Sequence, residues 1–101
     1  MKKILLICSA GMSTSILVGK MREAAKAQNL DAQIEAVAAE KFVELIPEYD
    51  VFLLGPQIRF KKDEFAAEAA KHGKNVDVVN TMDYGMMKGD KVLAHALSLI
   101  K

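Results

Sequence analysis

The sequence contains one cysteine, no tryptophan and only two prolines among its 101 residues. A single cysteine excludes an internal disulfide framework and a cysteine-rich metal site. The longest apolar runs are four or five residues, far below the roughly 20 that are needed to cross a bilayer. No signal-peptide pattern follows Met1. We therefore expect a cytoplasmic protein that is not inserted in a membrane, in which the lone cysteine stays a free thiol.

The charges of the sequence nearly balance. Its 14 lysine and arginine residues and 13 aspartate and glutamate residues give a net charge of +1. This balance gives no reason to expect binding to nucleic acid or to a membrane surface. With 51% hydrophobic and 27% charged residues, the composition fits one globular domain over residues 1–101. His72 and His95 lie on different predicted helices, so we interpret both as surface or helix-end residues and expect neither a metal nor a cofactor.

Strand-like and helical patterns alternate along the chain without an intervening linker. The strand-like runs cover 3–7, 32–38, 51–54 and 76–79, and the helical patterns cover about 15–28, 41–46, 63–72 and 90–99. The first helix is expected to bury a face from Leu17 to Gln28, and the third a face from Phe65 to Ala70. The alternation predicts a single three-layer α/β domain, in which helices cover both faces of a four-stranded parallel sheet.

Hydrophobicity also predicts the order of the strands. The first and third runs are continuously apolar, as central strands of a parallel sheet are. Gln33, Glu35 and Asp77 interrupt the other two runs, which are therefore expected at the edges. The resulting order 2-1-3-4 is flavodoxin-like, and such a sheet binds its ligand at the carboxyl ends of strands one and three. Two loops, 8–14 and 55–60, then form the crevice, and a third loop over 80–87 lies alongside.

Cys8 ends the first apolar strand and precedes a segment rich in hydroxyl groups. This segment, Ser9-Ala10-Gly11-Met12-Ser13-Thr14-Ser15, leads into a predicted helix. A helix N-terminus stabilises a thiolate and a phosphate alike, and Gly11 lets the backbone fold around a tetrahedral anion. Two plainer interpretations are a buried structural thiol at Cys8 and a helix N-cap among Ser13 to Ser15. The hydroxyl-rich turn favours a reactive thiol over the structural one.

The spacing after Cys8 resembles the phosphate-binding loop of the low-molecular-weight tyrosine phosphatases, Cys-x5-Arg-Ser/Thr. Five residues, Ser9 to Ser13, follow the cysteine, and Ser15 matches the serine of that pattern. Thr14 stands where the phosphatases have arginine. A guanidinium would hold phosphate bidentately and neutralise the charge that develops during hydrolysis. A loop that binds phosphate but hydrolyses it poorly is typical of a carrier.

The Cys8 to Ser15 segment, Gly55-Pro56-Gln57 and Tyr84-Gly85-Met86-Met87 together resemble the enzyme IIB component of the bacterial sugar phosphotransferase system. The similarity is to its lactose/cellobiose branch, which includes β-glucoside and chitobiose systems, and it covers essentially the whole chain. It implies a phosphotransferase in which Cys8 accepts a phosphoryl group from a phosphohistidine of the IIA protein. Cys8 would then transfer the group to a β-linked disaccharide held by the IIC membrane permease. It also implies a monomer when the subunit is free.

Several other residues are candidates for the crevice or for partner contacts. Gln57 can reach the crevice to hydrogen-bond phosphate, although Gly55 and Pro56 beside it are explained by turn chemistry alone. Asp83 resembles the phosphatases' general acid only in part, because no proline follows it. The remaining candidates form two groups. The basic cluster, which is either a solvated helix entrance or a patch for weak anion steering or partner contact, consists of Arg59, Lys61 and Lys62. The apolar group, which either packs over the last helix or, with Met12, docks IIA and IIC, consists of Tyr84, Met86 and Met87.

Three other functions compete with the carrier. A low-molecular-weight phosphatase-like hydrolase is the nearest, and Thr14 in place of arginine argues against it. A thiol-based arsenate reductase would need further cysteines for its redox relay. A flavodoxin-like binding module would need aromatic residues around a flavin, and this chain has no tryptophan.

Overall fold

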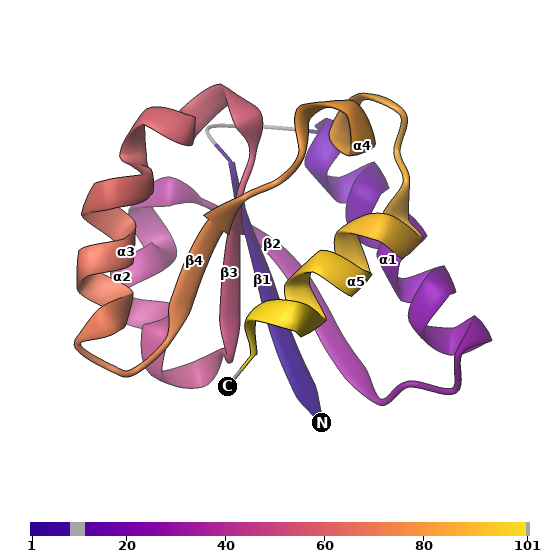
Figure 1. The fold of residues 1–101 in the computed structure, drawn as a ribbon, viewed down its shortest axis with the longest axis horizontal. Helices are drawn as coiled ribbons and strands as arrows, with labels where there is room; N and C mark the ends of the chain where they lie inside the picture. The colour runs from indigo at the N-terminus through magenta and orange to yellow at the C-terminus, as the bar shows by residue number, and fades with distance from the viewer. Residues whose placement is uncertain (9–11, 101) are drawn as a thin grey trace.

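A computed structural model of the chain describes residues 1–8 and 12–100, and for residues 12–14 the backbone alone. The elements alternate as in a doubly wound fold (Figure 1). Strands and helices run in the order β1 (Lys2–Cys8), α1 (Met12–Ala27), β2 (Ala32–Ala38), η1 (Ala39–Lys41), α2 (Phe42–Leu45), η2 (Ile46–Glu48), β3 (Val51–Leu54), η3 (Pro56–Lys61), α3 (Lys62–Ala70), β4 (Asn75–Val78), α4 (Thr81–Gly85) and α5 (Gly89–Leu99), where η marks a 3-10 helix.

The four strands form one parallel sheet in the order β2-β1-β3-β4, which confirms the predicted order. Ile4 of β1 pairs with Ile34 of β2 on one side and with Val51 of β3 on the other. Because all strands are parallel, their carboxyl ends lie along one edge of the sheet, at the top of Figure 1. The predicted α/β fold class is therefore confirmed.

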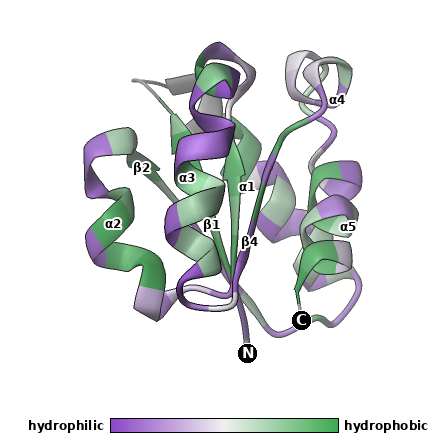
Figure 2. Cartoon of the chain, turned by 60° about the vertical axis from the view of Figure 1, so that its left-hand side comes forward, coloured by the Kyte–Doolittle hydropathy of each residue, from purple (hydrophilic) through white to green (hydrophobic). Residues whose placement is uncertain are grey.

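Alternate residues of the central strands enter two separate cores. Ile4 and Leu6 pack with α1 and α5, whereas Leu5 and Ile7 pack with α2 and α3, and all four are at most 1% exposed. Figure 2 shows the matching pattern in helix α5, whose hydrophobic and hydrophilic residues lie along different sides. A strand that is buried on both faces is stabilised by a continuous apolar sequence, because the side chains on either face are removed from water.

Four details differ from the sequence-based predictions. Helix α1 begins at Met12 instead of Ser15, and both Gln28 and Ala70, predicted to be buried, are exposed. The predicted loop over 80–87 contains the short helix α4. Its N-cap explains it: the Asn80 side-chain oxygen accepts hydrogen bonds from the N–H groups of Met82 and Asp83, at 2.9 and 3.1 Å. Such a cap stabilises a first turn even where the helix is too short to show periodicity.

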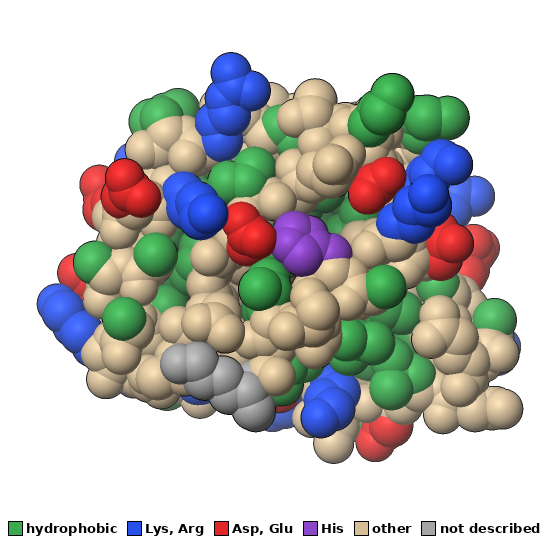
Figure 3. Space-filling view, in the orientation of Figure 1, with side chains coloured by type: hydrophobic (Ala, Val, Ile, Leu, Met, Phe, Trp, Pro, Cys, Tyr) green, Lys and Arg blue, Asp and Glu red, His purple; other side chains and the backbone are tan. Residues whose placement is uncertain are grey.

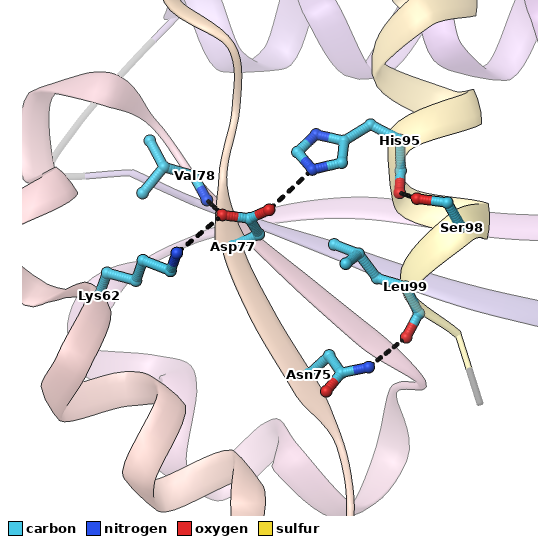
Figure 4. Close-up of polar contacts among 7 residues, drawn as sticks. All are labelled: Lys62, Asn75, Asp77, Val78, His95, Ser98 and Leu99. Carbon is cyan, nitrogen blue, oxygen red and sulfur yellow. Dashed lines mark hydrogen bonds and ion pairs between the residues drawn. The ribbon is translucent and has the colours of Figure 1, made fainter.

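Asp77 on the edge strand β4 connects the two helical layers (Figure 4). One carboxylate oxygen accepts from Lys62 Nζ of α3 at 3.1 Å and from the N–H of Val78 at 2.8 Å. The other lies 2.9 Å from His95 Nε2 of α5. Figure 3 shows a histidine beside an acidic side chain near the middle of one face. His95 is thus partly buried and bonded to the edge strand. The charge of Asp77 on this strand also discourages the strand from pairing with the sheet edge of another molecule.

We expect the free energy of unfolding to depend on pH through the ionisation of Asp77. Partial burial raises the pKa of Asp77, but the hydrogen bonds from His95, Val78 and Lys62 outweigh it and hold the pKa below its ordinary value. The stabilisation is therefore present above about pH 4 and is lost as the pH falls through the folded-state pKa. Asp77→Asn should lower the free energy of unfolding by about 1 kcal/mol at pH 7, and the difference from wild type should vanish near pH 2.

Urea unfolding at pH 7, 4 and 2 measures this difference. Asp31→Asn is the matched control, since the Asp31 side chain is 77% exposed and its nearest cation, the N-terminal amine, is 4.0 Å away. A difference for Asp77→Asn that stays constant over this pH range would contradict the assignment.

Candidate functional site at the carboxyl edge of the sheet

Cys8 is the last residue of β1, a central strand, and it lies at the carboxyl edge of the sheet. It pairs in register with Ala38, the last residue of β2. Its side chain is 7% exposed, and its Sγ donates a weak hydrogen bond to the carbonyl oxygen of Val37 at 3.9 Å. The thiol therefore contacts strand β2 at the carboxyl end of β1.

Helix α1 is the first helix after Cys8 in the chain. The helix begins at Met12, so Ser13, Thr14 and Ser15 lie inside its first turn instead of preceding it as N-caps. The first four N–H groups of a helix have no partner within the helix. Ser15 is exposed. Ser9, Ala10 and Gly11 lie outside the described residues, as do the side chains of Met12, Ser13 and Thr14.

Gly55 and Gln57 follow β3, the strand that pairs with β1, and Gln57 lies in η3. The N–H of Gly55 donates to the carbonyl oxygen of Ile7 at 2.8 Å, which holds the end of β3 against β1. A methyl group placed on Gly55 would lie 2.8 Å from Gln57 Oε1 and 3.9 Å from Cys8 Cβ. The side-chain oxygen of Gln57 thus lies close to Gly55, and the absence of a side chain on the glycine leaves room for it.

Helix α4 supplies the third side of the site. Its Tyr84 is 7% exposed and packs into the core on the α1 and α5 side. Gln57 Nε2 donates to the Tyr84 hydroxyl across 3.5 Å. This hydrogen bond therefore joins Gln57 to α4, while Gly55 is the residue that lies beside Cys8. Asp83, in the same helix, is partly buried, and its backbone N–H and carbonyl bond to Asn80 and Lys88.

The apolar residues predicted as one group after β4 are divided by the structure. Tyr84 is buried, Met87 is partly buried against the same core, and Met86 is 62% exposed. Exposed apolar side chains that the sequence analysis did not single out lie on elements at the same edge, and Figure 3 shows hydrophobic side chains along the top of the molecule. These residues are Ile16 on α1, Phe60 on η3 and Met82 on α4.

The predicted basic cluster is likewise divided. Lys62 is paired with Asp77, and Lys61 Nζ lies 5.9 Å from the Phe60 ring centroid and 5.8 Å from that of Phe65. Arg59 is exposed. These contacts make Lys61 and Lys62 parts of the η3 and α3 structure, which favours the interpretation as a helix entrance. Among the described residues, no helix has the length and apolar character to cross a membrane.

Comparison with known proteins identifies the family. Residues 3–95 match the family described as the lactose/cellobiose-specific IIB subunit of the PTS system. The chain is 47% identical over 100 residues to the oligo-β-mannoside-specific EIIB component of Bacillus subtilis, covering 99% of this chain and 97% of the relative. It is 46% identical to the galactose-specific and cellobiose-specific EIIB components of two Lactococcus lactis subspecies, covering 98% of this chain and 96% of each.

Solved structures agree with this assignment. The cellobiose-specific IIB component of Borrelia burgdorferi superposes with a TM-score of 0.81 at 42% identity, covering 98% of this chain and 91% of that one. The lactose-specific IIB domain of Streptococcus pneumoniae shares the fold, with a TM-score of 0.88 at 20% identity over 99% and 98% of the two chains. A lactose-specific EIICB component of Lactococcus lactis is 29% identical over 70 residues, 69% of this chain and 12% of that protein. This chain belongs to the lactose/cellobiose-specific IIB family and is a phosphotransferase component of the sugar phosphotransferase system.

Proposed function

We propose that Cys8 is the residue that carries the phosphoryl group. The observation that supports this most directly is the place of the chain's only thiol: it ends central strand β1 at the carboxyl edge and is followed by the first turn of α1. In the first step the thiolate attacks the phosphorus of a phosphohistidine on a IIA protein. The S–P bond forms as the P–N bond breaks, and the histidine leaves as a neutral ring after taking up a proton.

In the second step the phosphoryl group moves to sugar. A hydroxyl oxygen of a β-linked disaccharide attacks the phosphorus, the O–P bond forms, and the S–P bond breaks to restore the thiolate. The hydroxyl proton passes to solvent. Backbone N–H groups of the first turn of α1 are suited to stabilise the phosphoryl oxygens, because phosphoryl transfer depends mainly on positioning and charge stabilisation. Thr14, in the place of an arginine, favours transfer over hydrolysis.

Two partners would have to reach the same sulfur in turn, so the site needs an accessible surface around it. Phe60, Met82 and Met86 are 76%, 73% and 62% exposed. Exposed aromatic and methionine side chains suit contact with more than one protein. We propose that they help to dock IIA and then IIC, the latter holding the disaccharide at the cytoplasmic side of the membrane. Similarity to a lactose-specific EIICB component supports a IIC partner.

The sugar and the organisation of the chain complete the proposal. The relatives named for cellobiose and for oligo-β-mannoside support a β-linked substrate, cellobiose or a similar disaccharide. Residues 1–101 would act as one IIB domain, monomeric between its encounters with partners and without a cofactor.

A reconstituted relay tests the proposal. The protein is incubated with phosphoenolpyruvate, the general relay proteins and a cognate IIA, and its intact mass and the labelled peptide are determined. One phosphoryl group on the peptide that contains Cys8 is expected. Membranes with the IIC permease and cellobiose should then discharge it to cellobiose phosphate. Label on another residue, or rapid hydrolysis of an aryl phosphate without any carrier activity, would refute the proposal.

A further inference from the structure

Residues of η1, α2, η3 and α3 line a surface groove with a volume of about 520 Å³. Its apolar lining includes Ile58 and Phe65, which are buried members of the core on the α2 and α3 side. It also includes Val43 and Phe60, which are 60% and 76% exposed. The groove therefore joins core residues to two large apolar side chains that remain in contact with solvent.

The groove begins beside the strand ends that flank Cys8. Ala39, which lines it, directly follows Ala38, the residue that pairs in register with Cys8. The N–H of Ile58 donates to the carbonyl oxygen of Gly55 at 3.0 Å, and a Cβ on Gly55 would lie 3.9 Å from Cys8 Cβ. Figure 1 shows α2 and α3 on one side of the sheet and α4 on the other. A chain segment in the groove would therefore lie near the proposed phosphoryl acceptor, on the side of the sheet away from α4.

The charged residues of the groove are mainly acidic. Glu40 and Glu64 line it and are exposed, and within the described part of the chain neither forms an ion pair. The lining also contains Lys61, whose Nζ lies 5.9 and 5.8 Å from the ring centroids of Phe60 and Phe65. Two carboxylates thus face one ammonium group, so the groove is complementary to an apolar segment that carries lysine or arginine.

We propose that this groove binds a basic, apolar segment from a cytoplasmic loop of the IIC permease. The inference rests on the proposed function, in which the phosphoryl group passes from Cys8 to a sugar held by IIC. Cytoplasmic loops of membrane proteins carry an excess of lysine and arginine close to their membrane-spanning helices. This bias is a property of membrane proteins, so the acidic groove fits IIC, and the IIA donor has no need of it.

Sugar phosphorylation at increasing concentrations of the phosphorylated protein tests the groove. The protein is first phosphorylated by IIA and then added to membrane vesicles that contain the cognate IIC permease and cellobiose. Glu40→Lys/Glu64→Lys should raise the protein concentration at half-maximal rate about tenfold, because repulsion replaces attraction. Val43→Arg, which adds both bulk and a cation, should raise it by a similar factor. The maximal rate should not change in either variant.

The same variants should accept the phosphoryl group from IIA as the wild type does. Val43, Glu40 and Glu64 are exposed, so their substitution removes no core atoms and the fold is retained. The rate of transfer from phosphorylated IIA, and the IIA concentration at half-maximal rate, should therefore both stay at their wild-type values. This separates a defect in the contact with IIC from a defect in Cys8 itself.

Glu23→Lys/Glu48→Lys is the matched control. It makes the same change in net charge on exposed residues of α1 and η2 that do not line the groove. It thereby accounts for any general attraction to the anionic membrane surface, and its half-saturating concentration should stay close to that of wild type. Added salt should weaken the wild type and this control more than Glu40→Lys/Glu64→Lys, because screening removes an attraction that the groove variant already lacks.

If both groove variants keep the wild-type half-saturating concentration with IIC, or if the control variant changes by the same factor, IIC does not bind in the groove. An equal defect in transfer from IIA would assign the groove to the donor instead. Self-association of the wild type that the groove variants abolish, measured by sedimentation, would assign it to a second copy of the chain. If the wild type takes no phosphate on Cys8, the proposed function fails, and binding of the unphosphorylated variants to the same vesicles still decides whether IIC uses the groove.

Discussion

Replacing Cys8 with serine is expected to abolish sugar phosphorylation while leaving the fold intact. Serine has nearly the same shape, and the side-chain contact it weakens, that of Sγ with the carbonyl of Val37 at 3.9 Å, is itself weak. The hydroxyl, however, is not ionised near neutral pH and is a far weaker nucleophile than a thiolate. Loss of a nucleophile lowers turnover by roughly a thousandfold or more. The formation of cellobiose phosphate in the complete relay, with labelled phosphoenolpyruvate, measures the effect.

Thermal unfolding separates loss of chemistry from loss of structure in this variant. The melting temperature of Cys8→Ser should stay close to that of wild type, because no core volume is removed. Cys8→Ala, which keeps neither nucleophile nor donor, should be equally inactive. Retention of more than about a tenth of the wild-type rate by either variant would mean that another residue carries the phosphoryl group.

Local patterns were sufficient to predict the framework that positions Cys8. The apolar runs of β1 and β3 are read directly from Ile4 to Ile7 and from Val51 to Leu54, because both faces of a central parallel strand are buried. Gly73, just after the helical pattern over 63–72, predicts the end of that helix and has the left-handed φ of 70° that glycine favours there. The position of Cys8 at the carboxyl edge follows from the strand order alone.

What could not be predicted depends on contacts between distant residues or on very short elements. Helix α4 has five residues, too few for an apolar period, and its one local signal is Asn80 followed three positions later by Asp83. The hydrogen bond of Gln57 to Tyr84 joins residues 27 positions apart. Neither sequence segment indicates the other, because the contact exists only once β3 and α4 are placed at the same edge.

Gly89 shows the same dependence on distant contacts, and its effect on stability is expected to be large. It begins α5 and is buried where that helix crosses α1. A Cβ at this position would lie 2.4 Å from the Lys20 carbonyl carbon and 2.6 Å from Met21 N. These are backbone atoms, so the two helices must separate to admit it. Gly89→Ala should lower the free energy of unfolding by about 3 kcal/mol, which corresponds to a fall in melting temperature of roughly 10–20 °C.

Gly19→Ala provides the control for this prediction, because Gly19 lies in the interior of α1, one residue from Lys20, and a Cβ there would meet nothing within 4 Å. Alanine is favoured over glycine inside a helix by about 1 kcal/mol, so this variant should be more stable than wild type. The two substitutions each add one methyl group, Gly89→Ala to α5 and Gly19→Ala to α1. Stability changes of opposite sign would show that the two helices make their close contact at Gly89. Equal signs in urea or thermal unfolding would show that α1 and α5 do not meet at Gly89.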